Sequence, residues 1–148
     1  MTRAVNTALA GAGGVLQVVY AHTGAAFVLT TTTLTEIIAA TITPTSATSK
    51  ILLLVTAASV GKSASNAEGW FGVYRNGSSL LNPYDGIATY TGSTTTIGVG
   101  SVSCEYLDSP GTTSALTYSL RARDDQSSGL RINWEGGISS VTLLEIAA

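Results

Sequence analysis

The fold class is decided by residues 115–123, which read ALTYSLRAR. Apolar side chains occupy every second position from Leu116 to Ala122, and polar side chains occupy the positions between them. Strict alternation of this kind is typical of a β-strand that has one face on a core and the other face in water. This stretch therefore predicts a half-buried strand.

Other stretches of strand length occur along nearly the whole chain, separated by Gly, Ser, Thr, Asn and Pro. We expect strands over residues 15–22, 27–35 continued by 36–43, 50–58, 69–75 with its return through Leu80 and Leu81, 97–106, 115–123, 130–134 and 140–146. No useful length of sequence has the 3.6-residue period of a helix. About eight strands in one chain of 148 residues predict an all-β fold, an antiparallel jelly roll or β-sandwich.

Four local patterns refine this prediction. Residues 50–58 (KILLLVTAA) are apolar on both faces, which predicts a central strand that is covered on two sides. Asn76-Gly77 predicts a type I′ hairpin turn. The apolar positions switch face within residues 97–106, which indicates a bulge near Gly98–Ser101. A turn at Gly136-Gly137 is expected to join the last two strands.

The chain is expected to hold one domain, residues 15–148, preceded by an arm. Residues 1–14 (MTRAVNTALAGAGG) have no sustained period and end in a Gly cluster, which predicts a flexible arm. The stretch before the Ala-Leu-Ala at residues 8–10 is too short and too polar for a signal peptide. We therefore expect that the first Met is the mature start and that the chain is not exported.

Composition narrows the possible partners. Only 11% of the residues are charged, against about one quarter in an ordinary globular domain. Thr, Ser, Gly and Ala take their place, which indicates a chain that hides much of its surface in an oligomer or a lattice. A Thr-rich soluble sandwich is the alternative. The seven Arg and Lys residues are scattered, and no stretch approaches ~18–20 apolar residues, so neither a nucleic acid nor a membrane is an expected partner.

Residues that could perform catalysis or bind a cofactor are scarce. His22 and Cys104 are the only residues of their kinds, which leaves no disulfide, zinc site or evident catalytic triad. Gly61-Lys62-Ser63 lacks the earlier Gly of a phosphate-binding loop, because Thr56 stands there. Four aspartates could hold calcium, but Asp is common in turns; they are Asp85, Asp108, Asp124 and Asp125. We expect no cofactor, no metal and no enzymatic activity.

Aromatic residues gather in or beside residues 69–92. They are Trp70, Tyr74, Tyr84 and Tyr90, interleaved with Asn, Asp and Thr. Planar rings beside amide and hydroxyl groups suit stacking on a sugar or contact with a protein partner. Packing in the core is the alternative interpretation.

Several stretches together resemble a known group of proteins. They are GVLQVV (14–19), TPTSATSKIL (43–52), LDSPGTTS (107–114) followed by Thr117-Tyr118, and TLLEI (142–146). The chain resembles small virion proteins and fibre-end domains of tailed bacteriophages, notably those of cyanobacteria and marine bacteria. The resemblance implies a jelly-roll domain, usually a homotrimer, displayed on a virus particle.

A fibre would need a long N-terminal shaft, and only about 13 residues precede the first expected strand. The resemblance therefore favours a capsid decoration or cement protein, made in the host cytoplasm and bound to the major capsid protein at the capsid surface. The arm is then expected to contact the shell through Thr2, Arg3, Val5, Asn6 and Leu9. The alternative is a receptor-binding fibre domain that recognises host surface glycan through the four aromatic residues. A small depolymerase is the third and weakest interpretation.

Overall fold

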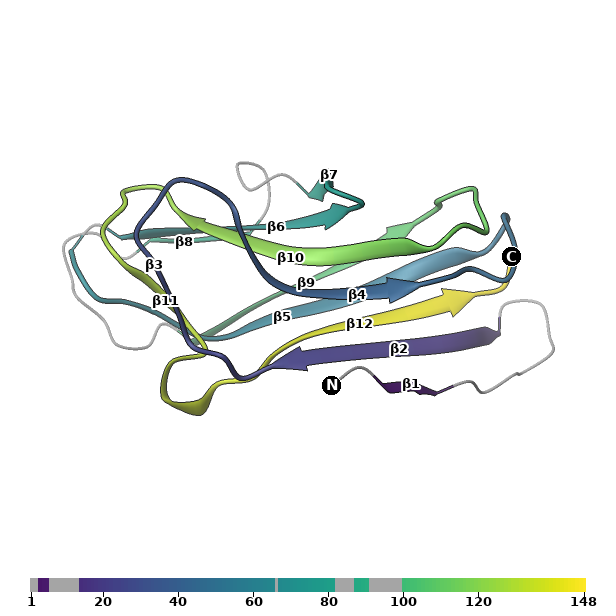
Figure 1. The fold of residues 1–148 in the computed structure, drawn as a ribbon, viewed down its shortest axis with the longest axis horizontal. Coiled ribbons are helices and arrows are strands. Elements are labelled where there is room, and N and C mark those ends of the chain that lie inside the picture. The colour runs from purple at the N-terminus through teal and green to yellow at the C-terminus, as the bar shows by residue number, and fades with distance from the viewer. Residues whose placement is uncertain (1–2, 6–13, 66, 82–86, 91–99) are drawn as a thin grey trace.

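The computed structural model describes residues 3–5, 14–65, 67–81, 87–90 and 100–148. Two antiparallel sheets pack face to face, and their strands run along the long axis of the molecule (Figure 1). The 3₁₀ helix η1 (Trp134–Gly136) is the only helix among these residues, and none of them forms a helix long and apolar enough to cross a membrane. The predicted all-β class is confirmed.

The first sheet, sheet 1, has four long strands at its centre. In order across the sheet they are β2 (Val15–Thr23), β12 (Ser139–Ile146), β5 (Lys50–Lys62) and β9 (Gly100–Asp108). Three short strands extend it: β1 (Arg3–Val5) beside β2, then β11 (Leu130–Ile132) beside the end of β5, and β3 (Phe27–Leu29) beside β11.

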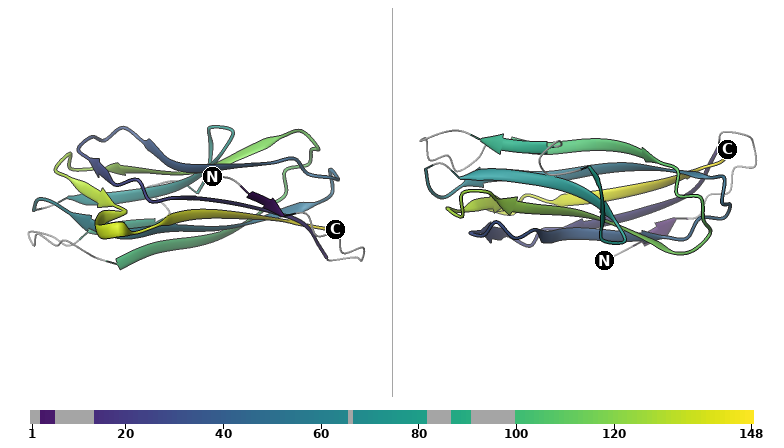
Figure 2. Two further views of the ribbon diagram at one scale, coloured as in Figure 1. Left: turned by 60° about the horizontal axis from the view of Figure 1, so that its bottom comes forward. Right: turned by 90° about the horizontal axis from the view of Figure 1, so that it is seen from above.

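The second sheet, sheet 2, is smaller. Its order is β4 (Thr35–Ile42), β10 (Leu116–Asp124) and β6 (Glu68–Arg75), and the far edge of β6 pairs with both β7 (Ser78–Leu81) and β8 (Ile87–Tyr90). The layering of the two sheets can be followed in the turned views of Figure 2.

The connections make this sandwich a jelly roll. The chain passes from one sheet to the other between β2 and β4, β4 and β5, β5 and β6, β8 and β9, β9 and β10, and β10 and β12. One layer therefore has the strand order β2-β12-β5-β9, and the other has β4-β10-β6 followed by β7 and β8. If β7 and β8 count as one strand, the sandwich has the eight main strands of a jelly roll. Of the three-residue strands, β3 and β11 begin the expected strands 27–35 and 130–134, whereas β1 is an addition that the sequence pattern does not predict.

The core lies between the sheets and is formed by alternate residues of each strand. In β10 the predicted apolar set is buried, from Leu116 at 4% exposed to Ala122 at 0%. The matching positions of β5 are Ile51, Leu53, Val55 and Ala57, none more than 3% exposed. Burial of each large apolar side chain contributes about 1.5–3 kcal/mol, which makes these two strands the centre of the fold.

Two of the local predictions are corrected. Strand β5 is covered on its core side only, because Leu54 on the opposite side is 38% exposed. The pairing of β5 with β9 does shift near Gly100, but the one extra residue lies on β5, between Ala57 and Val60. Ser59 has a φ of +45° there, which bends β5 instead of β9. Residues 98 and 99 of the predicted bulge lie outside the described residues.

The hairpin prediction is confirmed. Asn76 and Gly77 have φ values of +49° and +83°, as a type I′ turn requires, and they join β6 to β7. The Asn76 side chain also accepts a hydrogen bond from the Thr117 backbone, which ties the turn to β10. Gly136, with a φ of +86°, ends η1 and supplies the predicted turn before β12.

The described part of the predicted arm is a strand, which differs from the expectation of a flexible segment. Strand β1 pairs with β2 in the register Arg3↔Tyr20 and Val5↔Val18. An edge strand such as β2 exposes unpaired backbone groups, and β1 satisfies them. The other predicted arm contacts, Thr2, Asn6 and Leu9, lie outside the described residues.

Candidate interaction surface

The outer side of sheet 1 carries a row of apolar side chains across four strands. The pairing places Val18, Leu144, Leu52 and Leu107 side by side on β2, β12, β5 and β9. They point away from the core, because their chain neighbours Leu53 and Leu143 are fully buried on the inner side. The row is apolar from β2 to β9.

Two further rows lie beside this one. The next row is Tyr20, Thr142, Leu54 and Glu105, and the row after it is His22, Ser140, Thr56 and Ser103. We call these twelve residues the apolar face. Among the described residues, several large apolar side chains are exposed, and three of them belong to the apolar face. They are Tyr20 at 40%, Leu54 at 38% and Leu107 at 50%. The ring of Tyr20 stacks on His22 with 5.4 Å between the ring centroids.

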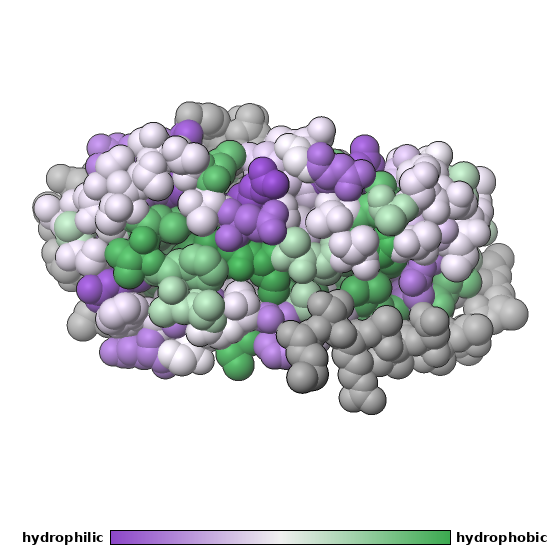
Figure 3. Space-filling model, viewed as in Figure 1, coloured by the Kyte–Doolittle hydropathy of each residue, from purple (hydrophilic) through white to green (hydrophobic). Residues whose placement is uncertain are grey.

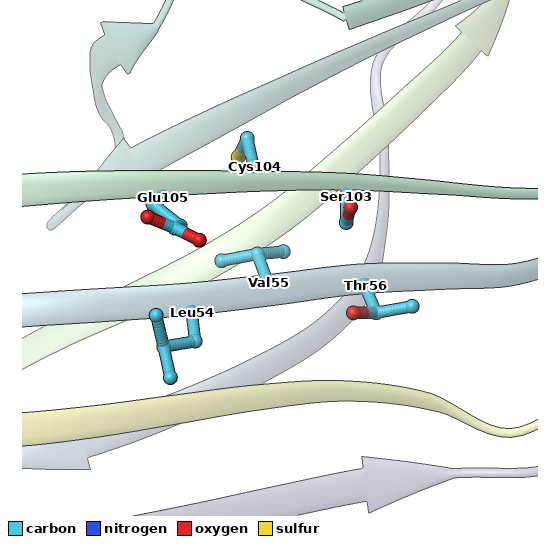
Figure 4. Close-up of a pocket in the computed structure, with 6 residues that line it drawn as sticks. All are labelled: Leu54, Val55, Thr56, Ser103, Cys104 and Glu105. Carbon is cyan, nitrogen blue, oxygen red and sulfur yellow. The ribbon is translucent and has the colours of Figure 1, made fainter.

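A shallow hollow of about 550 Å³ lies within the apolar face, between β5 and β9. Leu54, Thr56, Ser103 and Glu105 surround it, and the paired residues Val55 and Cys104 form its floor. Figure 4 shows these residues, with the Glu105 carboxyl group between the two strands. The hollow exists because Thr56 and Ser103 are short where the neighbouring row has Leu54.

Cys104 lies on the inner side of β9 and is not a prepared nucleophile. Burial, together with the negative charge of Glu105, raises the pKa of its thiol to about 11. The thiolate is the reactive form of cysteine, so the thiol is protonated and inert at neutral pH.

Charge is nearly absent from the apolar face. Along β2, β12, β9 and residues 50–58 of β5, the charged side chains on the outer side are Lys50, at the end of a strand, and Glu105, on the edge strand β9. Figure 3 shows one side of the molecule coloured by hydropathy, where pale and green residues predominate and hydrophilic residues form separate purple clusters.

The outer side of sheet 2 has a different chemistry. Trp70 and Tyr74, two of the predicted partner-binding residues, project from β6 opposite β10. Arg121 lies over the Tyr74 ring at 5.0 Å from its centroid, and Arg123 lies over Trp70 at 6.0 Å. We call Glu36, Trp70, Tyr74, Arg121 and Arg123 the arginine face.

The arginine face is held together by its own contacts. Arg121 pairs with Glu36 at 3.5 Å, and Arg123 pairs with Asp125 at 2.6 Å. Tyr74 is only 7% exposed, so its ring is covered and offers little area for stacking on a sugar. Tyr84 lies outside the described residues, and the structure describes only the backbone of Tyr90, which pairs with Glu68. The structure therefore does not gather the four aromatic residues into one described site.

A buried cluster connects the two sheets at one end of the sandwich. The carboxylate of Asp108, from β9, accepts two hydrogen bonds from Arg75 Nη1 at 2.9 and 2.7 Å and one from the Tyr118 hydroxyl at 2.7 Å. Its hydrogen bond raises the pKa of Arg75, and burial, with Asp108, raises the pKa of Tyr118 far above its usual value. Arg75 therefore stays charged and Tyr118 stays neutral at neutral pH, which fits a structural clamp.

Glu145, on β12, has a similar structural role. Its carboxylate accepts hydrogen bonds from Gln17 Nε2 at 2.6 Å, and from the Thr45 backbone and hydroxyl at 2.7 and 2.8 Å. Burial acts to raise the pKa of Glu145, but these hydrogen bonds outweigh it and hold the pKa below its usual value. The contacts fix the loop after β4 against sheet 1.

Three of the four aspartates considered as calcium ligands make other contacts, and the fourth, Asp85, lies outside the described residues. Asp124 accepts backbone hydrogen bonds from Glu68, Gln126, Ser128 and Gly129, and so shapes the loop after β10. Asp108 and Asp125 are paired with arginines. The part of the chain that the structure describes holds no group of three or more His, Cys, Asp or Glu residues that could bind a metal ion.

No protein-family model matches the chain, and no curated protein matches it. The surfaces above are therefore interpreted from their own geometry. Sequence reasoning selected the arm and the aromatic residues and did not assemble the apolar face. The sequence nevertheless contained a signal for the apolar face. The positions that alternate with the core residues hold large apolar side chains, namely Leu52, Leu54, Leu107 and Leu144.

Proposed function

We propose that the chain is a non-enzymatic structural protein of a bacteriophage particle. It would act as a capsid decoration or cement protein that forms a homotrimer on the capsid surface and binds the major capsid protein. The sequence resemblance supports the viral setting, and the jelly-roll fold is the one that this resemblance implies.

The apolar face is the observation that carries the proposal. A protein that acts alone in water rarely exposes a contiguous apolar patch, and such patches mark surfaces that another molecule covers. Reinforcing a shell requires contacts between several subunits at once, so that modest individual affinities combine. A low-charge domain with one apolar side meets that requirement better than it meets the requirements of catalysis.

Localisation on intact particles tests the proposal. Cryo-electron microscopy of virions should show this chain at the junctions between capsomers. Particles that lack the protein should regain the density when the purified chain is added, and they should then resist heating better. Density confined to the tail, or no density on the particle, would contradict a decoration role.

A receptor-binding domain is the second candidate, and Trp70 is the residue that favours it. Its ring is half-buried on the outer side of sheet 2 beside Arg123, an arrangement that suits a sugar or an anionic group. Trp70→Ala should then reduce adsorption to host cells without changing the melting temperature by more than a few degrees. The matched change Tyr74→Ala, at a covered ring, should reduce stability instead.

A further inference from the structure

We infer that the apolar face is the surface through which the chain binds a second copy of itself. The number of copies, three, rests on the proposed function, but the choice of face rests on the described residues alone.

The composition of the face is that of a permanent interface between copies. Transient interfaces are about as polar as the rest of a protein surface, whereas interfaces of homo-oligomers are more apolar and lose charge at their centre. The row of Val18, Leu144, Leu52 and Leu107 has no polar member. Glu105 and Lys50 lie at the periphery, where interfaces have a polar rim.

The absence of central charge has a specific consequence for self-association. Near a symmetry axis, a side chain meets the same side chain of the other copy, so a charge there would face a like charge. Leu52, Leu54 and Thr142 occupy the centre of the face, and each can meet its own copy without repulsion. A surface selected for a differently charged partner would have no reason to keep this centre neutral.

The relief of the face is also self-complementary. The leucine row forms a ridge, and the hollow over Val55 and Cys104 lies three residues farther along the same strands. One surface thus offers both a ridge and a recess, so that two copies can place the ridge of one toward the recess of the other. Tight packing of this kind is what stable interfaces share with protein interiors.

The dimensions of the face are sufficient for the centre of such an interface. Four strands about 4.8 Å apart span roughly 15 Å, and the five residues of β5 from Leu52 to Thr56 at about 3.4 Å each span roughly 17 Å. A surrounding rim would supply the rest of the ~800 Å² per partner of a standard-size interface. The exposed side chains Leu54 and Leu107 would then be its principal anchors.

The test is the oligomeric state of the purified full-length chain, measured by sedimentation velocity and light scattering in the absence of any shell. We expect the wild type to be an oligomer at micromolar concentration. Leu54→Glu and Leu107→Glu should each weaken association about 30-fold or more, as loss of an interface hot spot does. The matched control is Val28→Glu, at a 51%-exposed strand residue outside the apolar face, which should leave the oligomer intact.

Two results would overturn the inference: a monomeric wild type, or an oligomer that both variants retain. Circular dichroism melting shows whether each variant folds, and Leu54→Thr gives a milder change in case the glutamate at this position prevents folding. Because no shell is present, the result is independent of the proposed function. Face variants that dissociate while the wild type binds no shell would support this inference and contradict the decoration role. If both face variants instead remain oligomeric and the wild type binds shells, this inference would be contradicted and the decoration role supported.

Discussion

The two outer faces of this sandwich differ although both are built from alternating strands of the same jelly roll. On sheet 2, arginines lie over aromatic rings and pair with carboxylates, so the surface is complete by itself. On sheet 1, leucines stand in a row that no described residue of the chain covers. Free polar groups can be satisfied by water or by their neighbours, but apolar area is only stabilised by another apolar surface. The difference therefore identifies the side that needs a partner.

The largest expected effect on stability compares the two sides of a single strand, β5. Leu53 and Leu54 are adjacent on β5, but Leu53 is fully buried in the core and Leu54 is 38% exposed on the apolar face. Leu53→Ala should lower the free energy of unfolding by about 2–5 kcal/mol, the usual cost of a large-to-small change in a core. Leu54→Ala should cost less than about 1 kcal/mol in a monomer.

Chemical denaturation at several protein concentrations measures both changes. If the apolar face binds another copy, the cost of Leu54→Ala should grow with protein concentration, whereas the cost of Leu53→Ala should not. Equal costs for the two substitutions at every concentration would show that the two sides of β5 are equally covered within one chain.

The second effect concerns the clamp that holds the two faces together. Asp108→Ala removes the acceptor shared by Arg75 and Tyr118, and leaves a buried hydroxyl and a partly buried guanidinium without it. We expect a loss of about 2–4 kcal/mol, below the upper range for a buried pair because the Arg75 side chain is 31% exposed. Urea denaturation provides the measurement, and a loss under 1 kcal/mol would mean that the cluster does not bridge the sheets. Tyr118→Phe, which keeps the ring and removes one hydrogen bond, is the matched control and should cost about 1 kcal/mol.

Much of this fold could be predicted from the sequence, and the reason is visible in β10. Its alternation sorts Leu116 and Tyr118 inward and Thr117 and Arg121 outward, and the structure places them so. The same rule was misleading for β5. A strand that is apolar on both faces is predicted to be shielded from water on both, but the pattern does not identify the molecule that covers the second face. The structure shows that the second cover is not supplied by the described residues of this chain.

The candidate site was harder to predict than the fold. The apolar face depends on the registers of β2, β12, β5 and β9, which bring Val18 next to Leu144 across 126 positions of sequence. Pairing over such distances cannot be read from local patterns. The aromatic residues were conspicuous in the sequence, yet Tyr74 is covered by Arg121, a contact between neighbouring strands that sequence spacing does not reveal. The strand formed by Arg3–Val5 was missed because three residues carry no measurable period.

A third effect concerns the pH dependence of folding stability, which arises from a buried carboxylate on the inner side of sheet 1 and not from the apolar face. The pKa of Glu145 in the folded state lies below the usual value of 4.5, so the folded state binds its proton less readily than the unfolded state does. The resulting stabilisation is complete above about pH 4.5 and is lost as the pH falls through the folded pKa. Thermal melts from pH 6 to pH 3 should show a smaller acid loss for Glu145→Gln than for the wild type. Identical acid profiles would mean that the hydrogen bonds from Gln17 and Thr45 do not favour the charged form.

The smallest effect tests whether the arginine face is complete by itself. Arg121→Ala removes a cation from above the Tyr74 ring and an ion pair with Glu36, and both contacts are partly exposed. Each is worth about 0.5–1 kcal/mol or less, so the melting temperature should fall by only a few degrees. Arg121→Lys should recover part of that loss, since it keeps the charge but not the planar group that stacks on the ring. Neither variant should change the oligomeric state, because the residue lies on the side of the sandwich opposite the apolar face. Dissociation of the oligomer by Arg121→Ala would place the contact between copies on sheet 2, and would reverse the assignment of the two faces.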